Sequence, residues 1–307
     1  MAFIFIFLDG VGLGREDENN PFYSSSTPAI AKILDGNKLT MGSADKEYIN
    51  ASLLSLDACL GVQGIPQSAT GQTSLFTGTN ASKILGYHLN AYPNEQLRDV
   101  LAERGVFSQL KRNKHTCTFA NAYRPGRLKE LFAGGVKHYS CSTLITYYAG
   151  LEFRSLKDLE RGNAVYMDII NDHLRELGYD VKLITPGAAA RNLINIAREF
   201  SFTLYESFLS DIIGHKGDNH KAEEIVKRID AFLGSIIDNM NQERDLLLVT
   251  SDHGNLENSA VKVHTKNPVP ALVIGKNRKR FVDILVSKKD ITGVVPAILE
   301  IIEATKN

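Results

Sequence analysis

Three adjacent residues, Asp252, His253 and Gly254, place an oxygen donor, a nitrogen donor and a flexible turn at one point of the chain. They follow the apolar run Leu246–Val249, which is typical of a strand buried on both faces of a parallel sheet. Chemistry in open α/β sheets collects at the carboxyl ends of the strands. A carboxylate beside an imidazole suits a divalent metal ion. The tripeptide therefore predicts a metal site, with an ordinary surface turn as the alternative.

Two other predicted strands also end in residues that bind metals. The run Ala2–Leu8 is apolar throughout and leads into Asp9, and the run Phe202–Leu209 leads into Asp211 and His215. Asp211 and His215 are spaced i, i+4, so they share a face if this segment is helical. The glycines after Asp9 do not fit a dinucleotide-binding GxGxxG pattern. For Asp9 alone, the alternative is a helix N-cap or turn aspartate.

A second informative stretch is Gly61–Asn80, with the sequence GVQGIPQSATGQTSLFTGTN. Small and hydroxylated residues dominate it, and it carries no charge. Such a loop can bring a hydroxyl and several backbone N–H groups close to an anion, especially where a helix begins at its end. Ser68 and Thr70 are the candidate hydroxyls. An ordinary Ser/Thr/Gly-rich connector is the alternative.

The candidate ligands fall together at predicted strand ends or in glycine-flanked loops. They are Asp9, Ser68, Asp211, His215, Asp252, His253 and His264. A single histidine is more often a surface or core residue than a ligand, but coincidence explains the whole set poorly. The set exceeds what one tetrahedral ion needs, so two sites with three or four protein ligands each fit it better.

Bulk composition excludes several classes of protein. The 307 residues include 35 basic and 35 acidic side chains, so no excess of positive charge exists to bind nucleic acid. The three cysteines form no CxxC pair, which argues against a secreted disulfide framework. The opening MAFIFIFLDG lacks a basic region and is too short to span a bilayer. We expect a cytoplasmic protein without a membrane or nucleic-acid partner, of unspecified oligomeric state.

The remaining pattern predicts an α/β fold with a mostly parallel sheet between layers of helices. Asn219–Asn241 has the apolar stripe of an amphipathic helix. Val269–Ile274 is predicted as a buried strand and Asp290–Ala304 as a closing amphipathic helix.

The middle of the chain has a different sequence pattern and is predicted to form an inserted, smaller α/β cap domain. Charged helical patterns there alternate with short β-like runs: helical Glu95–Arg104 and Leu156–Leu177, and β-like Thr116–Ala122, Ser142–Tyr148 and Val181–Ile184. The expected division is a first core part at 1–91, the cap at 92–195 and a second core part at 196–307.

Taken together, these motifs resemble the alkaline phosphatase superfamily, and most closely its branch of cofactor-independent phosphoglycerate mutase and phosphopentomutase. The resemblance rests on a strand followed by Asp-Gly, a small-residue loop with a hydroxyl, DIIGHKG, SDHGN and a later histidine. It covers about 1–80 and 200–275 but not the middle. It implies an alkaline-phosphatase-like core and a two-metal phosphoryl-transfer enzyme, a phosphomutase or a phosphatase.

The resemblance also implies roles for individual residues. One divalent ion, Mn²⁺ or Zn²⁺, would be held by Asp211, His215 and His264. The other would be held by Asp9, Asp252 and His253, with Ser68 as its fourth ligand and as the nucleophile. Because SATGQ carries Gln72 where those mutases usually carry His, the choice of Ser68 over Thr70 stays open.

Substrate-binding residues are less well defined by the sequence, and the candidates are Thr70, Arg124, Arg127 and Lys216. Arg124 and Arg127 can form a fork for a phosphate or carboxylate, or they are solvated helix-end residues. Lys216 lies beside predicted ligands and can supply local positive charge. We expect a small phosphorylated metabolite as substrate. The alternatives are a phosphodiesterase or sulfatase-type hydrolase of the same superfamily, although the CxPxR-like context of sulfatases is missing, and a non-catalytic metal-binding domain.

Overall fold

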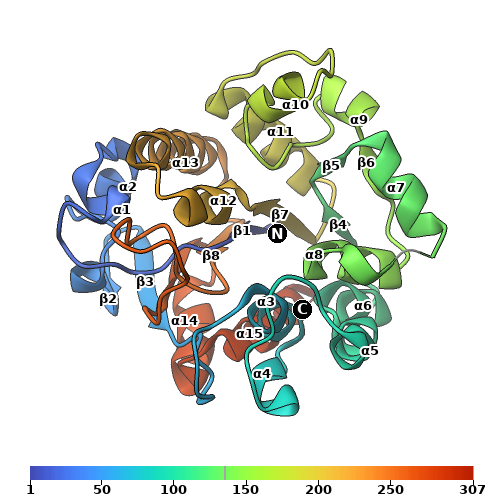
Figure 1. The fold of residues 1–307 in the computed structure, drawn as a ribbon, viewed down its shortest axis with the longest axis horizontal. Helices are drawn as coiled ribbons and strands as arrows, with labels where there is room; N and C mark the ends of the chain where they lie inside the picture. Colours follow the sequence, from blue (N-terminus) through green and yellow to red (C-terminus); the bar gives the residue numbers. More distant parts are fainter. Residues whose placement is uncertain (135, 307) are drawn as a thin grey trace.

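A seven-stranded sheet crosses the middle of the protein in the computed structural model, which describes residues 1–134 and 136–306 (Figure 1). In order across the sheet, the strands are β2 (Lys46–Glu47), β3 (Ala51–Leu56), β9 (Val269–Gly275), β8 (Leu246–Thr250), β1 (Phe3–Leu8), β7 (Phe202–Ser207) and β4 (Cys117–Phe119).

The sheet is mixed, but most of its strands point the same way. β1 lies between β7 and β8 and pairs in parallel with both, and β4 pairs in parallel with β7. β9 is antiparallel to both β8 and β3, and β2 is antiparallel to β3. The predicted α/β class with a mostly parallel sheet is therefore confirmed. The carboxyl ends of β7, β1 and β8 lie side by side.

The central strand β1 is buried on both faces, as its sequence predicts. Successive side chains of a strand point to opposite faces. Ile4 and Ile6 accordingly enter one hydrophobic cluster, and Phe3, Phe5 and Phe7 enter the other. Each cluster is covered by a layer of helices. Because β1 is apolar on both faces, the sheet lies between two helical layers and the fold has three layers.

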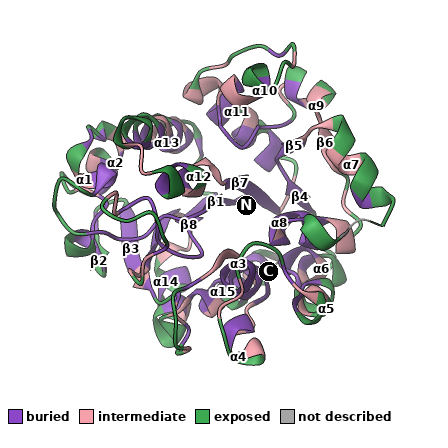
Figure 2. Ribbon diagram, in the orientation of Figure 1, coloured by how far each residue is buried: buried purple, intermediate pink, exposed green. Residues whose placement is uncertain are grey.

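One layer consists of helices from both halves of the chain. They are α1 (Pro21–Ser24), α2 (Pro28–Ile33), α11 (Pro186–Ala197), α12 (Leu209–Lys216) and α13 (Asn219–Asn239). The longest, α13, begins at Asp218, whose side chain accepts the Lys221 N–H. Its apolar stripe packs on the sheet while its outer face is exposed (Figure 2). The predicted helix at 219–241 is confirmed.

The opposite layer holds the remaining core helices. They are α3 (Ser68–Thr77), α4 (Ala81–Leu85), α5 (Glu95–Arg104), α6 (Val106–Arg112), α8 (Cys141–Tyr148), α14 (Arg278–Lys288) and α15 (Val294–Glu303). Half of Gly61–Asn80, which reads as a loop in the sequence, is thus the buried helix α3.

A smaller group of elements lies beside the main sheet, at the upper right of Figure 1. It comprises β5 (Ala122–Tyr123), β6 (Arg154–Ser155), α7 (Pro125–Phe132), α9 (Leu156–Glu160) and α10 (Asp172–Glu176). Short 3-10 turns occupy Met41–Ser43, Val136–His138, Ile291–Gly293 and Ala304–Lys306.

The middle segment differs from its predicted structure at several points. Ser142–Tyr148 is helical instead of β-like, and no strand forms at Val181–Ile184. Leu156–Leu177 holds two short helices rather than one long one. The expected cap at 92–195 overlaps the core, because β4 extends the main sheet and α5, α6 and α8 pack into its second hydrophobic cluster.

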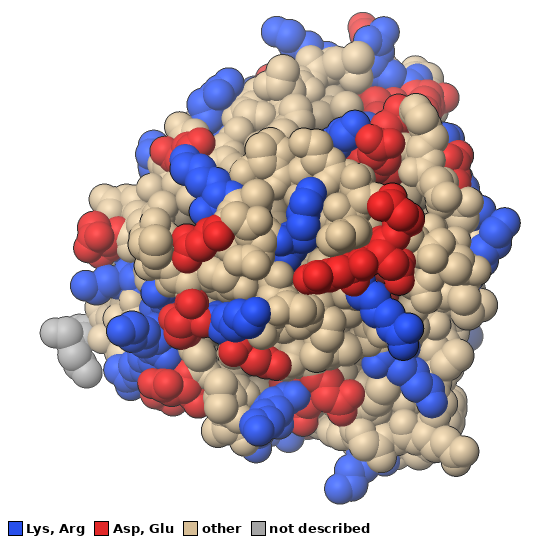
Figure 3. Space-filling view, turned by 90° about the vertical axis from the view of Figure 1, so that its left-hand side faces the viewer, with Lys and Arg blue, Asp and Glu red and all other residues tan. Residues whose placement is uncertain are grey.

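The surface carries mixed charge, with acidic and basic side chains interspersed on the face drawn in Figure 3. Among the described residues, no helix is both long enough and apolar enough to cross a membrane.

Candidate active site

The candidate ligands gather where β7, β1 and β8 end. Asp9 directly follows β1, and its N–H donates to the carbonyl oxygen of Ser207 at the end of β7 (2.9 Å). Asp252 and His253 follow β8, and Asp211 lies in the first turn of α12, just after β7. Because these parallel strands are neighbours, residues distant in sequence meet at one sheet edge.

Asp9, Asp252 and His253 form the first ligand group. The Nε2 atom of His253 lies 3.4 Å from Asp9 Oδ1 and 3.4 Å from Asp252 Oδ2. Ser68 Oγ lies 3.1 Å from the same nitrogen. All three ligand residues are buried. The structure thus brings together the four residues expected to share one ion.

Asp211, His215 and His264 form the second ligand group. Asp211 Oδ1 lies 3.4 Å from His264 Nε2, and Asp211 Oδ2 lies 3.3 Å from His215 Nε2. The two histidine Nε2 atoms are 3.0 Å apart. His253 adjoins this group too, since ligand atoms of Asp211, His253 and His264 all lie within 4.8 Å of one another.

Backbone carbonyls fix the orientation of two histidine rings. His264 Nδ1 lies 2.9 Å from the carbonyl oxygen of Pro66, and His215 Nδ1 lies 3.0 Å from that of Lys262. A carbonyl partner requires the proton on Nδ1, which leaves the Nε2 lone pair free to face the site.

The buried oxygens of the first group fit a cation. Asp9 Oδ1 and Asp252 Oδ2 are buried without a hydrogen-bond partner among the described residues. Such atoms are costly in a protein interior unless something pairs with them. Both face His253 Nε2, so the unpaired oxygens and the imidazole nitrogen form a donor set suited to a divalent ion.

The electrostatics of these residues agree with that fit. Burial, with Asp252 and Asp211 nearby, raises the pKa of Asp9 well above its usual value. Burial also lowers the pKa of His253, which favours the neutral imidazole that binds metals. Burial alone would raise the pKa of Asp211, but the neighbouring His264, His253 and Asn255 side chains outweigh it and lower this pKa to about 2.

Ser68 is the first residue of α3, so its hydroxyl lies at the helix N-terminus. Gln72, one turn later, donates from Nε2 to Asp9 Oδ2 (3.1 Å). Thr70 is fully buried, and its hydroxyl donates to the carbonyl oxygen of Gln67 (3.1 Å). Ser68 therefore faces the ligand groups, and Thr70 does not line the cavity beside them.

Glu257 was not singled out from the sequence, although its carboxylate joins the loops that carry the ligands. Oε2 accepts the N–H of Gly12 (2.9 Å) and the N–H of Asn255 (2.7 Å). Oε1 accepts the hydroxyl of Thr265 and the Asn267 amide. A Cβ at Gly12 would lie 2.5 Å from this carboxyl group, so the glycine after Asp9 permits the close contact.

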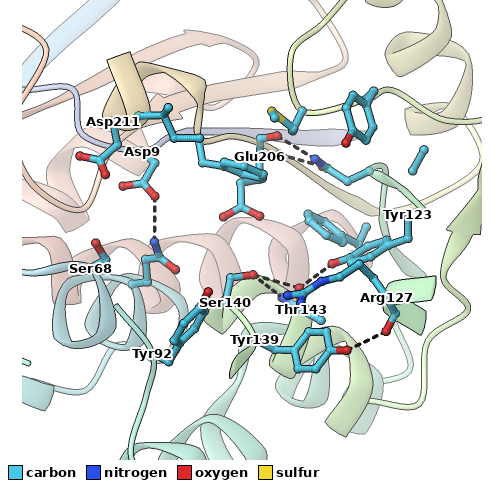
Figure 4. A pocket seen from close by; sticks show the side chains of 18 of the residues that line it. Asp9, Ser68, Tyr92, Tyr123, Arg127, Tyr139, Ser140, Thr143, Glu206 and Asp211 are labelled. Carbon is cyan, nitrogen blue, oxygen red and sulfur yellow. Dashed lines mark hydrogen bonds between the residues drawn. The ribbon is translucent and has the colours of Figure 1, made fainter. Parts of the chain in front are cut away.

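A cavity of about 480 Å³ opens beside Ser68, Asp9 and Asp211 (Figure 4). Arg124 and Arg127 are among the residues that line it. Lys216 instead lines a separate cavity.

The cavity wall also contains Glu206, which sequence reasoning missed. Its backbone is held by the Asn121 side chain, which donates to Glu206 O (2.7 Å) and accepts from Glu206 N (2.9 Å). The Ser142 hydroxyl donates to its carboxyl Oε2 (2.5 Å). Burial raises the pKa of Glu206 to about 7.

Comparison with known proteins agrees with this geometry. Residues 178–306 match the model of the Metalloenzyme superfamily. The resemblance to alkaline phosphatase-like metalloenzymes is confirmed. Among solved structures, a TAB5 alkaline phosphatase variant has a TM-score of 0.54 at 12% identity and covers 98% of this chain and 97% of its own. The PH0037 protein of Pyrococcus horikoshii has a TM-score of 0.54 at 15% identity, covering 89% and 85%. At these identities the likeness concerns the fold.

Curated relatives match over shorter stretches. A 2,3-bisphosphoglycerate-independent phosphoglycerate mutase of Prochlorococcus marinus is 26% identical over 204 residues, which is 62% of this chain and 32% of the relative. A phosphopentomutase of Clostridium kluyveri is 33% identical over 96 residues, or 31% and 24%. The chain therefore spans at most about a third of the length of these two metalloenzyme relatives.

Proposed function

We propose that this protein is a metal-dependent phosphoryl-transfer enzyme that acts on a small phosphate monoester through Ser68. The observation that carries the proposal is the position of the Ser68 hydroxyl, 3.1 Å from His253 Nε2 at the junction of the two ligand groups. A protein that only bound metal would not need a hydroxyl there. The relatives named as mutases support the same chemistry.

Two divalent cations, Mn²⁺ or Zn²⁺, fit the donor set. Asp9, Asp252 and His253 with Ser68 would hold one, and Asp211, His215 and His264 the other. Bound at these groups, the ions would lower the pKa of the Ser68 hydroxyl and neutralise charge on the phosphoryl oxygens.

The residues around Ser68 prepare it for in-line attack on phosphorus. Its place as the first residue of α3 directs the positive end of the helix dipole toward an anionic phosphoryl group. Gln72 holds Asp9 in place, and the guanidinium of Arg124, which makes no hydrogen bond or ion pair with the described residues, can add positive charge on the cavity side. Phosphoryl transfer depends mainly on such positioning and electrostatics.

The reaction is proposed to proceed in two halves. In the first, the Ser68 oxygen attacks phosphorus and the substrate oxygen leaves, which produces a phosphoserine. In the second, water or a substrate hydroxyl attacks this phosphoserine and frees Ser68. Water as the acceptor makes the protein a phosphatase, and a substrate hydroxyl makes it a mutase.

The test is turnover by the purified protein loaded with Mn²⁺ or Zn²⁺ on a panel of phosphate monoesters, combined with mass spectrometry of trapped phosphoenzyme. We expect release or migration of phosphate and a phosphorylated peptide containing Ser68. Ser68→Ala should lose both, while Thr70→Ala, which removes a hydroxyl on the same helix outside the cavity, should keep the modified peptide. Absence of turnover with every metal, or undiminished turnover by Ser68→Ala, would overturn the proposal.

A further inference from the structure

The residues that line the cavity change in chemical type with distance from the ligand groups. Ser68, Asp9 and Asp211 lie at one end, Glu206 lies next to them, and Tyr123, Tyr139 and Arg127 lie at the other end (Figure 4). A volume of about 480 Å³ falls within the usual range for ligand pockets. It leaves ample room for a group beyond the phosphate.

Most hydroxyls of the far wall are already hydrogen-bonded to one another. Tyr123 lies 2.6 Å from Thr143 Oγ1, which lies 2.9 Å from Ser140 Oγ. Ser140 lies 3.0 Å from Ser142, which donates to Glu206. Each of these four hydroxyls donates its one hydrogen in one of the four contacts. None of the four hydroxyls therefore has a hydrogen left to donate to a ligand.

Other polar groups of this wall are occupied as well. The Tyr139 hydroxyl donates to the carbonyl oxygen of Arg127 (2.6 Å). The guanidinium of Arg127 lies 4.5 Å from the centre of the Tyr139 ring and donates to the carbonyl oxygen of His138 (3.1 Å). Among the described residues, the polar groups of this wall that remain available to a ligand include the Arg124 guanidinium, the second carboxyl oxygen of Glu206 and the hydroxyls of Tyr92 and Tyr166.

What the wall also presents is aromatic surface, chiefly from Tyr92, Tyr123 and Phe208, since Phe119, Tyr139 and Tyr166 are buried. The rings lining the cavity are those of Tyr92, Phe119, Tyr123, Tyr139, Tyr166 and Phe208. Tyr123 is held edge-on between Phe119 (6.2 Å) and Phe153 (5.0 Å). Rigid rings of this kind bind planar groups by stacking at a low cost in conformational entropy.

Glu206 adds a second requirement to the occupant. Its position between the Ser68 end and the rings places a carboxyl group against the part of the ligand next to the phosphate. Because Ser142 occupies only Oε2, the other oxygen can accept a hydrogen bond from a ligand hydroxyl, which a carboxylate on the substrate could not donate.

From this order, and on the basis of the proposed function, we propose that the substrate is a phosphate ester of nucleoside type. Its phosphate would lie at Ser68, its sugar hydroxyls at Glu206 and its aromatic base against the ring-lined wall. A short hydroxy acid phosphate such as phosphoglycerate would leave the rings unused and bring a carboxylate toward Glu206.

A matched substrate pair tests the proposal on the metal-loaded enzyme. Uridine or adenosine 5′-monophosphate and ribose 5-phosphate share a primary alkyl leaving group, so they differ in the base and not in the chemistry. We expect kcat/KM for a nucleotide to exceed that for ribose 5-phosphate about tenfold or more, in line with the usual strength of base stacking. Equal values, or a preference for ribose 5-phosphate or 3-phosphoglycerate, would overturn the inference.

Substitutions of Tyr92 test whether the aromatic wall causes the preference for a nucleotide. Tyr92 is 44% exposed, so its removal spares the core. Tyr92→Ala should lower the ratio of the two kcat/KM values several-fold, and Tyr92→Phe, which keeps the ring, should preserve the ratio. Tyr87 is 49% exposed and lies outside the cavity lining, so Tyr87→Ala should not change the ratio. An unchanged ratio in Tyr92→Ala would contradict the proposal.

Binding to Ser68→Ala separates this inference from the proposed function. If the wild-type protein turns over none of the esters, the proposed function fails, and calorimetry on metal-loaded Ser68→Ala still reports whether the nucleotide binds more tightly than ribose 5-phosphate. If the wild-type protein turns over both esters equally and the variant binds both equally, only the substrate inference fails.

Discussion

His253 is the residue that the two ligand groups have in common. Its Nε2 faces Asp9 and Asp252, and it lies within 4.8 Å of the ligand atoms of Asp211 and His264. His215, by contrast, reaches only Asp211 and His264 and has a side chain that is 45% exposed. The two histidines should therefore contribute unequally to metal binding.

His253→Ala should weaken binding of both ions, whereas His215→Ala should weaken one and leave the other near its wild-type affinity. Removing a hydrogen-bond partner of a metal ligand commonly reduces metal affinity by about 10- to 100-fold. Removing a ligand itself should cost at least as much. Calorimetric titration of the metal-free proteins with Mn²⁺ or Zn²⁺ gives the two affinities. Equal effects of the two substitutions on both ions would contradict this division.

Asp9 gives metal binding a pH dependence. Burial, then Asp252 and Asp211, raise the pKa of Asp9, so in the metal-free protein it keeps a proton at pH values where an ordinary aspartate has lost it. A cation must displace that proton, and metal affinity should rise with pH. Calorimetry in two buffers of different ionisation enthalpy should detect proton release, which should shrink in Asp9→Asn. Zero release in the wild-type protein would contradict the expectation.

At the residue scale, the sequence was informative where a ligand type coincided with a strand end. Asp9, Asp252 and His253 stood out for that reason. Glu206 did not, because within FTLYES it reads as an ordinary strand residue, and its partners Asn121 and Ser142 come from distant parts of the chain. Glu257 follows Asp252 closely, but its role depends on contacts between two loops, those after β1 and β8, whose proximity only the folded chain reveals.

At the scale of elements, the loops after β1 and β8 form one unit around Glu257. Its carboxylate accepts N–H groups from Gly12 and Asn255, and Asn255 in turn donates from Nδ2 to Asp211 Oδ1 (2.7 Å). Thr265, the neighbour of His264, donates to the other oxygen. The positions of both ligand groups thus depend on a residue that binds no ion itself.

Glu257→Gln places an amide nitrogen against these donors, so we expect about 10- to 100-fold weaker metal binding, with activity restored at high metal concentration. Asp230→Asn is the matched control. Asp230 is also buried and accepts two backbone N–H groups, those of Ala29 and Ile30, but it lies in α13 away from the site. Calorimetric titration of both variants with metal measures the two affinities. Equal metal affinities in the two would refute a positioning role for Glu257.

Helix α8 illustrates why some elements could not be predicted. Its segment Ser142–Tyr148 is rich in Thr, Ile and Tyr, which favour strands. The Ser140 side chain nevertheless caps the helix by accepting the Thr143 N–H (3.4 Å), and Leu144 and Ile145 are fully buried in the core. Tertiary packing outweighed local propensity here. In α13, by contrast, the apolar period and the packing agree, and the prediction succeeded.

At the scale of the whole molecule, the site brings together carboxyl groups that repel one another unless a cation neutralises their charge. Asp9, Asp252 and Asp211 meet at the edge of a buried sheet. Because the pKa of Asp9 is raised on folding, the folded chain binds this proton more tightly than the unfolded chain. Its contribution to stability is therefore present at low pH and is lost as pH rises from the usual aspartate range through the raised pKa.

Removing metal should consequently lower Tm, and the loss should be larger at about pH 8 than at about pH 5. Differential scanning calorimetry with a chelator and with excess Mn²⁺ measures both differences. The double variant Asp9→Asn, Asp252→Asn should show little response to metal. A metal effect on Tm that is identical at the two pH values would contradict this account.

The ligands are also widely separated along the chain, with Asp9 near its start and His264 far beyond its middle. During translation, Asp9 and Ser68 leave the ribosome long before Asp252, His253 and His264 have been made. Neither ligand group can therefore hold a metal with its full set of donors before residues 252–264 have been made. Metal binding by the full set would follow their synthesis, and a cell short of the ion would accumulate unloaded molecules.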